Sequence, residues 1–179
     1  MIYDAADYVS SHEAKSFKAR YKFGAWVVDA AGINCVSELT GALAGYTDVT
    51  QLDFCTHGCS GEVGFKNGTD LSISTLKRVK IARSFFGPQR FDKNYAAKLL
   101  FMGCETAKGS QGRRFLEAAG RHFLSGKGGF VGGTKISNFY PFVGNTRVPP
   151  GGQLVVIQFD VNGKIIGEKT VKAGLIGSW

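Results

Sequence analysis

The sequence predicts one α/β domain built around a mostly parallel sheet. Short apolar runs alternate along the chain with segments of helical periodicity, which is typical of strand–helix–strand units. Two Asn-Gly pairs, at 67–68 and 162–163, lie between apolar stretches and predict hairpin turns. The 179 residues have the size of one ordinary domain. No linker or repeat divides them, so we predict a single domain over 1–179 with a polar lead-in segment at 1–22.

The first half of the chain carries two predicted strands, a hairpin and two helices. Residues 24–30 (GAWVVDA) form an apolar run bounded by Gly and predict a buried strand. Residues 34–45 space their apolar side chains as a helix does. Residues 50–58 (TQLDFCTHG) predict a second strand that ends at a turn. Residues 62–73 surround the first Asn-Gly turn, and the basic stretch 74–86 is predicted to be helical.

The second half of the chain repeats the alternation and ends in a hairpin. Residues 97–103 (AKLLFMG) predict a third strand that leads directly into Cys104. Residues 110–124 place large apolar side chains on one helical face. Residues 128–134 (GGFVGGT) predict a fourth strand, and residues 153–171 predict two strands joined at the second Asn-Gly pair. This order predicts a sheet flanked by helices on both faces, with a C-terminal β-hairpin.

The formal net charge of +8 favours acidic partners, such as nucleic acid, an anionic small molecule or an acidic peptide, although it also serves solubility. Cations concentrate in the region 77–98, where a solvated surface is the default interpretation and an anion site the functional one. These cations are Lys77, Arg78, Lys80, Arg83, Arg90, Lys93 and Lys98. Nucleic acid is the less favoured partner because few aromatic side chains lie between them, among them Phe85, Phe86 and Phe91.

The cysteine usage and the N-terminus indicate the compartment. The four cysteines form no CxxC pair and are too few for a disulfide scaffold, which favours a reducing compartment. The N-terminus lacks a basic start followed by an apolar run, so we expect no signal peptide. No stretch approaches the ~18 apolar residues of a membrane span, and no membrane association is expected.

Two reactive residues fall where predicted strands end. His57 closes the second strand and Cys104 the third, and each has a glycine beside it. Open α/β sheets bind ligands at the carboxyl ends of their strands, so neighbouring strands would bring imidazole and thiol to one edge. Hydrolysis by a thiol needs a histidine that promotes the thiolate and protonates the leaving amine. It also needs backbone N–H donors for the oxyanion, which Gly58 and Cys104 can supply. The helix at 110–124 adds a modest dipole effect on the thiolate if its start lies close to Cys104.

At this point the sequence resembles a known family. A strand ending in His-Gly and another ending in Gly-Cys resemble the caspase-like clan of cysteine peptidases, which includes caspases, gingipains, legumains, separases and CHAT-type domains. The stretches HGCSGEVGF and LLFMGCETAKGSQGRRFLEAAGRHFL, followed by GGFVGGT, resemble the bacterial CHAT-like branch most. The resemblance spans roughly residues 24–134. It implies a three-layer caspase-like sandwich, with His57 as general acid and base, Cys104 as nucleophile and Gly58 as oxyanion donor.

The resemblance also implies an activity and its partners. It implies a cysteine endopeptidase that hydrolyses protein or peptide substrates through an acyl-enzyme, without cofactor or metal. Some toxin-borne peptidases of the clan respond to a polyphosphorylated inositol bound at a basic surface near a C-terminal hairpin. By loose similarity, an anionic effector at region 77–98 is a further hypothesis. We expect a cytoplasmic protein, or one that is delivered into a host cytosol.

Two other interpretations stay open. His57 and Cys104 can be structural residues, in which case the domain is an inactive caspase-like module that binds an acidic partner or an anionic ligand through its basic surface. Cys55, His57, Cys59 and Cys104 can form a tetrahedral zinc site, since the first three alternate along one strand. Against zinc, C-x-H-x-C is not a usual ligand spacing, and Gly58 interrupts the strand.

One unexpected carboxylate and several absent motifs also bear on the predicted fold and function. Asp53 is unexpected in a strand buried on both faces, so we expect it to face a helix end or a cation. The chain also lacks a phosphatase loop, because Ser110 stands where an arginine is required six residues after Cys104. It lacks a nucleotide P-loop and a GxGxxG fingerprint as well, which disfavours phosphoryl and hydride transfer.

Overall fold

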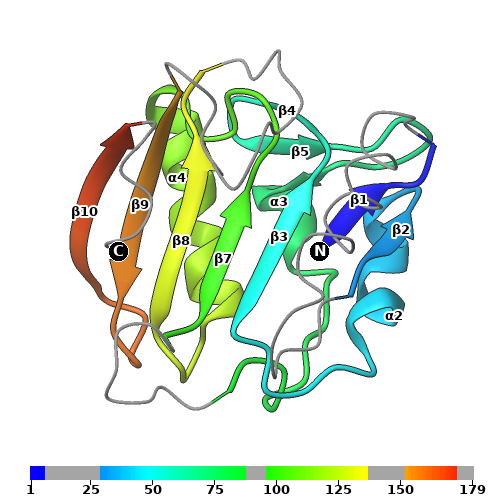
Figure 1. Cartoon of the computed structure of the whole chain (residues 1–179), viewed down its shortest axis with the longest axis horizontal. Coiled ribbons are helices and arrows are strands. Elements are labelled where there is room, and N and C mark those ends of the chain that lie inside the picture. Colours follow the sequence, from blue (N-terminus) through cyan, green and yellow to red (C-terminus); the bar gives the residue numbers. More distant parts are fainter. Residues whose placement is uncertain (7–28, 88–95, 137–151, 173–179) are drawn as a thin grey trace.

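A seven-stranded sheet forms the centre of the molecule, in the order β10-β9-β8-β7-β3-β1-β2 (Figure 1). The computed structural model describes residues 1–6, 29–87, 96–136 and 152–172. The neighbouring strands β8, β7, β3, β1 and β2 pair in parallel. The strand β9 is antiparallel to both of its neighbours, β8 and β10. The strands are β1 (Ile2–Asp4), β2 (Ala31–Ile33), β3 (Gln51–Cys55), β7 (Lys98–Phe101), β8 (Gly129–Thr134), β9 (Gln153–Phe159) and β10 (Ile165–Lys172).

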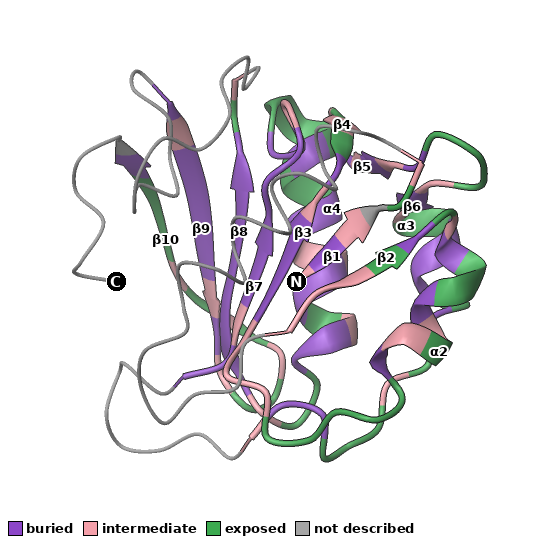
Figure 2. Ribbon diagram, turned by 45° about the vertical axis from the view of Figure 1, so that its right-hand side comes forward, coloured by how far each residue is buried: buried purple, intermediate pink, exposed green. Residues whose placement is uncertain are grey.

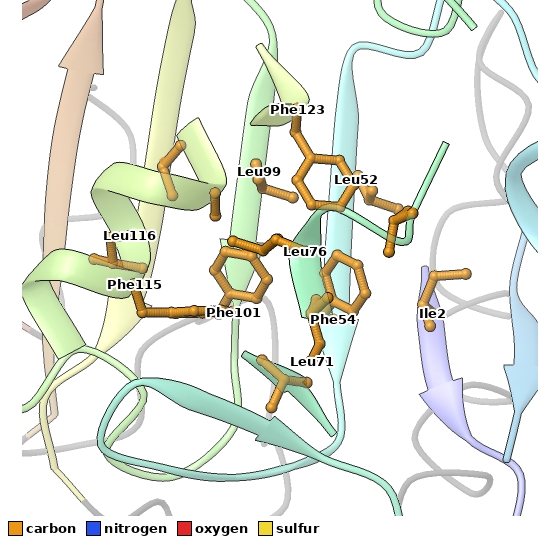
Figure 3. Close-up of a cluster of buried hydrophobic side chains, with 14 of the residues drawn as sticks. Ile2, Leu52, Phe54, Leu71, Leu76, Leu99, Phe101, Phe115, Leu116 and Phe123 are labelled. Carbon is orange, nitrogen blue, oxygen red and sulfur yellow. The ribbon is translucent and has the colours of Figure 1, made fainter. Parts of the chain in front are cut away.

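The helices of the described part pack on one face of this sheet (Figure 2). They are the 3-10 turn η1 (Val36–Glu38), α2 (Leu39–Leu43), α3 (Ile73–Leu76) and α4 (Gly109–Phe123). The helix α4 packs against β8 and β9, and its aromatic side chains reach the neighbouring strands: Phe115 meets Phe101 of β7, and Phe123 meets Phe54 of β3 (Figure 3). This face holds most of the buried apolar side chains of the described chain.

The opposite face of the sheet is buried as well. Its apolar side chains include Leu100 on β7, Phe130 on β8, and Leu154 and Val156 on β9. Parallel strands buried on both faces have continuous apolar runs, as β7 and β8 do. The α/β class, the mostly parallel sheet and the C-terminal hairpin are therefore confirmed, and the arrangement is compatible with a three-layer sandwich.

A second, three-stranded antiparallel sheet lies beside the carboxyl end of β3. It consists of β4 (His57–Cys59), β5 (Glu62–Gly64) and β6 (Leu71–Ser72). The predicted hairpin around Gly68 is present, but Gly68 is needed for close packing, since a Cβ there would lie 2.2 Å from the Cβ of Cys35. Gly163, in the β9–β10 turn, instead has the positive φ of 76° that an Asn-Gly hairpin uses.

Two predicted helices are shorter than expected. In place of the helix predicted at 34–45, the structure has the 3-10 turn η1 followed by the short helix α2. In place of the helix predicted at 74–86, it has only the short helix α3. After Leu76 the chain leaves the helix because residues 84–86 run beside Asp48 and Val49. The amide of Val49 bonds to the Phe85 carbonyl at 2.7 Å. Tertiary pairing there overrides the helical spacing of the apolar residues.

The N-terminal predictions are tested only in part. The lead-in at 1–22 begins with β1, which was not predicted, and its residues 7–22 lie outside the described part. Most of the strand predicted at 24–30 also lies outside it, and the described strand β2 follows at Ala31–Ile33.

Candidate active site

The strands that precede His57 and Cys104 are neighbours in the sheet. β3 and β7 pair in parallel, with Phe54 opposite Phe101, so both strands end at the same edge. The chain bends at Thr56 and continues as β4, which begins at His57. Cys104 lies in the turn of residues 104–107 that follows β7. The predicted side-by-side arrangement of the two strands is thus confirmed.

The two glycines beside these residues allow their backbones to touch. A Cβ on Gly103 would lie 2.8 Å from the carbonyl oxygen of His57. A Cβ on Gly58 would lie 2.9 Å from the carbonyl oxygen of Cys104 and 2.6 Å from the Thr106 methyl group. Real Cβ atoms are essentially never found so close to backbone atoms. The structural role of these glycines is therefore to let the two chain segments approach each other.

The end of β8 supports the Cys104 turn from one side. The amide of Glu105 donates to the Ile136 carbonyl at 3.2 Å, and the amide of Ala107 donates to the Thr134 carbonyl at 2.8 Å. The Thr134 hydroxyl donates to the Gly103 carbonyl. The backbone on both sides of Cys104 is therefore held by hydrogen bonds.

The β4–β5 turn supports the Cys104 turn from the other side. The amide of Gly61 donates to the Thr106 carbonyl at 3.2 Å, and the Ser60 hydroxyl donates to the Lys108 carbonyl at 2.6 Å. Because β8 and the β4–β5 turn both bond to it, the Cys104 turn is built as a rigid element, which a catalytic site requires.

Glu105, the residue after Cys104, has a left-handed backbone with φ of 56°. This conformation costs a non-glycine residue about 1–2 kcal/mol. The surrounding hydrogen bonds maintain it, and the Glu105 carboxylate pairs with the Lys108 ammonium at 3.0 Å. Strained backbone of this kind is enriched at functional sites, and here it lies next to the candidate nucleophile.

Exposure and charge differ among the residues of this edge. His57 is exposed, and Gly58 and Cys104 are half-buried, so solvent reaches all three.

Burial raises the pKa of the exposed Cys59 thiol, and the hydrogen bond to Glu62 raises it further, with Sγ and Oε2 3.5 Å apart. Cys59 is therefore held as a thiol and is a poor nucleophile.

Cys104 is not at the helix start itself. α4 begins at Gly109, and the turn of residues 104–107 separates the cysteine from it. Dipole effects decline within the first turn of a helix, so the suggested contribution of α4 to the thiolate is small.

Comparison with known proteins adds a family. A family model described as a domain of unknown function, DUF4347, matches residues 15–122. The chain belongs to the DUF4347 family. The matched stretch contains both candidate catalytic residues, Gly58 and nearly all of α4. No curated protein and no solved structure matches this DUF4347 chain. No helix in its described ranges is long and apolar enough to cross a membrane.

The zinc interpretation depended on one continuous strand, and the bend at Thr56 divides it. Cys55 belongs to β3, whereas His57 and Cys59 belong to β4 of the other sheet. Among the residues that the structure describes, no group of three or more His, Cys, Asp and Glu side chains can hold a metal ion. The four residues of the predicted zinc site are all described.

Asp53 has a different partner from those expected. Its side chain is 5% exposed, and both carboxylate oxygens accept from the Gln51 amide nitrogen, at 2.7 and 2.9 Å. The expectation of a helix end or a cation was therefore wrong within the described residues. A buried carboxylate is tolerated where a hydrogen-bond donor meets it, and Gln51 supplies one.

The basic region of this DUF4347 domain is partly described. Lys77, Arg78, Lys80 and Arg83 are exposed, and no ion pair involves them within the described ranges. Lys98 lies on β7 and is half-buried, away from a solvated helix face. Arg90, Lys93 and Phe91 lie outside the described residues. Phe85 and Phe86 are each 2% exposed, so neither is available to stack on a nucleic-acid base.

A pocket that the sequence did not signal opens at the other end of the sheet. It has a volume of about 240 Å³ and is lined by residues at the amino ends of β1 and β3 and by Asp29, Tyr46 and Asp48. The Tyr46 hydroxyl donates to the Asp29 carboxylate at 2.5 Å, and this bond, with burial, raises the pKa of Tyr46. Neither His57 nor Cys104 lines this pocket.

Proposed function

We propose that this DUF4347 domain is a cysteine endopeptidase of the caspase-like type, with Cys104 as nucleophile and His57 as general acid and base. The observation that supports this most is the contact between the backbones of His57 and Gly103. It brings the two reactive residues to one solvent-accessible edge of a rigid sheet, where open α/β proteins bind their ligands.

In the proposed reaction the Cys104 sulfur attacks the peptide carbonyl carbon, and the thiol proton passes to His57. The C–N bond then breaks, and the His57 imidazolium protonates the departing amine. A water molecule attacks the resulting thioester while His57 accepts one of its protons. The C–S bond breaks, the acid product leaves, and the proton returns to the Cys104 sulfur. Water is the only reactant besides the peptide and these two side chains that the proposed reaction uses.

The developing oxyanion would be stabilised by backbone N–H groups. The amides of Gly58 and Cys104 belong to the two segments that contact each other, and hydrogen bonds hold the Cys104 segment in place. Donors that are already positioned are worth far more than donors that must reorganise during the reaction. A protein or peptide chain is the substrate that this mechanism requires.

The test is cleavage of a peptide library by the full chain and by two cysteine variants. We expect Cys104→Ala to abolish cleavage and to keep the fold, which circular dichroism checks. Cys59→Ala is the matched control, because Cys59 is an exposed thiol on the neighbouring strand β4 and is expected to be dispensable. Cleavage by Cys104→Ala at the wild-type rate would show the proposal to be wrong.

Thiol labelling tests the proposed pair without a known substrate. Iodoacetamide should label Cys104 fastest of the four cysteines, and more slowly after His57→Ala, because the imidazole promotes the thiolate. Mass spectrometry assigns the label to each cysteine.

The alternative is a catalytically inactive caspase-like module that binds an acidic partner or an anionic ligand. It is favoured by the exposed cations Lys77, Arg78, Lys80 and Arg83, which form no ion pair in the described ranges. Equal labelling of all four cysteines would favour this module. Salt-sensitive binding of an acidic polypeptide that is lost when these four cations are replaced by glutamine would then support it directly.

A further inference from the structure

The carbonyl of Gly103 points into the protein toward two buried hydroxyls. The Thr134 hydroxyl, at the end of β8, donates to it. The Thr106 hydroxyl shares its single hydrogen between the Phe101 carbonyl at 3.2 Å and the Gly103 carbonyl at 3.4 Å. Thr106 is 0% exposed and Thr134 is 1% exposed. Threonine hydroxyls this deep in a protein need a hydrogen-bond partner, and they find theirs in the carbonyls around Gly103.

The direction of this carbonyl determines the direction of the next amide. Gly103 and Cys104 share one planar, trans peptide group, in which the C=O and the N–H point in opposite directions. Because the two hydroxyls draw the Gly103 oxygen inward, the Cys104 N–H is directed away from them. That N–H is one of the two donors assigned to the oxyanion above.

We propose that Thr106 and Thr134 are positioning residues that hold the Gly103–Cys104 peptide plane and so aim the Cys104 amide at the oxyanion. This inference rests on the cysteine peptidase function for its kinetic effect. The threonines touch neither substrate nor sulfur. They act on the reaction through the orientation of a backbone group that the chain could otherwise rotate.

Contacts on the other side of the peptide complete the restraint. The Cα of Gly103 lies so close to the His57 carbonyl that no side chain fits there. The amide of Ala107 bonds to the Thr134 carbonyl at 2.8 Å, so Thr134 holds the Cys104 turn by its side chain and by its backbone. Only the side-chain bond is lost when valine replaces threonine, which makes the substitution selective.

The kinetic test uses Thr134→Val, which keeps the shape of the side chain and removes the hydroxyl. We expect kcat for peptide hydrolysis to fall about 10- to 100-fold with KM little changed, since loss of a whole oxyanion donor costs about 10²–10³-fold. Binding of a peptide aldehyde, which forms an oxyanion on the cysteine, should weaken by a similar factor. Alkylation of Cys104 by iodoacetamide should stay at the wild-type rate because that reaction forms no oxyanion.

Two control variants separate positioning from stability. Thr134→Ser keeps the hydroxyl and should restore most of kcat. Thr75→Val removes another buried hydroxyl, which donates to the Asp70 carbonyl at 2.8 Å in the β6–α3 segment, and should leave kcat per folded molecule unchanged. A Thr134→Val enzyme with wild-type kcat per folded molecule would overturn the inference.

An NMR measurement of bond direction decides the inference even for a chain that cleaves nothing. The residual dipolar coupling of the Cys104 N–H bond should change in Thr134→Val and stay at the wild-type value in Thr75→Val, because the peptide plane rotates once the Gly103 carbonyl loses the Thr134 hydroxyl. An absence of cleavage by the wild type would overturn the peptidase proposal alone. An unchanged Cys104 N–H coupling in Thr134→Val would overturn the positioning of the peptide by this hydroxyl.

Discussion

The rings of Phe54 and Phe101 stack with their centroids 5.1 Å apart and an angle of 24° between their planes. The two residues are opposite each other at the ends of β3 and β7, and both are fully buried. His57 and Cys104 each follow one of these phenylalanines by three residues, and Figure 3 shows both rings within the buried apolar cluster. The apolar core therefore supports the candidate site.

Removal of one ring should destabilise the whole domain. Phe101 also contacts Phe115 of α4, with centroids 4.8 Å apart, so Phe101→Ala opens a cavity between sheet and helix. We expect it to lower the free energy of unfolding by about 3–5 kcal/mol, measured by urea denaturation. Ile166→Ala, at a side chain 56% exposed on β10, is the control and should change it by no more than about 0.5 kcal/mol. A small effect of Phe101→Ala would contradict the packing described here.

The elements with dense, regular patterns were predictable from the sequence. β7, β8, α4 and the β9–β10 hairpin agree with their predicted ranges to within a few residues. In these segments the apolar spacing, the glycines and the Asn-Gly turn all indicate the same structure. When the local signals agree in this way, the secondary structure of a segment can be predicted without knowledge of its tertiary contacts.

The parts that could not be predicted depend on contacts between distant segments. The basic stretch after Leu76 has helical spacing, but its end pairs with Val49, which no local pattern reveals. For the same reason the sequence identified Gly58 and Gly103 but not their use, which follows from the approach of β4 to the Cys104 turn. Thr106 and Thr134 carried no signal at all, because hydroxyl-to-carbonyl bonds depend on the folded chain.

The close approach at Gly103 should make even a methyl group damaging. In Gly103→Ala the new Cβ would meet the His57 carbonyl oxygen at 2.8 Å, and backbone would have to move on both sides. We expect a loss of about 1–3 kcal/mol in the free energy of unfolding and slower iodoacetamide labelling of Cys104. Gly41→Ala is the matched control, since a Cβ there meets nothing within 4 Å. It should be neutral or stabilise α2 by about 0.5–1 kcal/mol. Equal effects of the two substitutions in thermal unfolding would contradict the described contact.

The reactivity of Cys59 should respond to Glu62. A raised pKa means that less of the thiol is ionised at any given pH. Burial is the main cause of the raised pKa of Cys59, and the Glu62 carboxylate adds to it by its hydrogen bond and its charge. Glu62→Gln removes the charge, so we expect the pKa of Cys59 to fall and its alkylation near neutral pH to become faster. The measurement is site-resolved labelling across a pH series, in which the Cys59 profile should shift to lower pH. The profile of Cys35, which has the Ser37 hydroxyl as its neighbour, should stay in place.

The left-handed backbone at Glu105 predicts a characteristic order of stabilities. Glycine adopts a φ of 56° without steric cost, whereas a β-branched side chain is strongly disfavoured there. Glu105→Gly loses the exposed ion pair to Lys108, worth at most about 1 kcal/mol, and gains a similar amount from relief of strain. We therefore expect Glu105→Gly to unfold within about 1 kcal/mol of the wild type. Glu105→Val should be less stable than Glu105→Gly by at least about 1 kcal/mol. Urea denaturation of the two variants side by side decides the matter. A valine variant as stable as the glycine variant would contradict the left-handed backbone at Glu105, next to the proposed nucleophile.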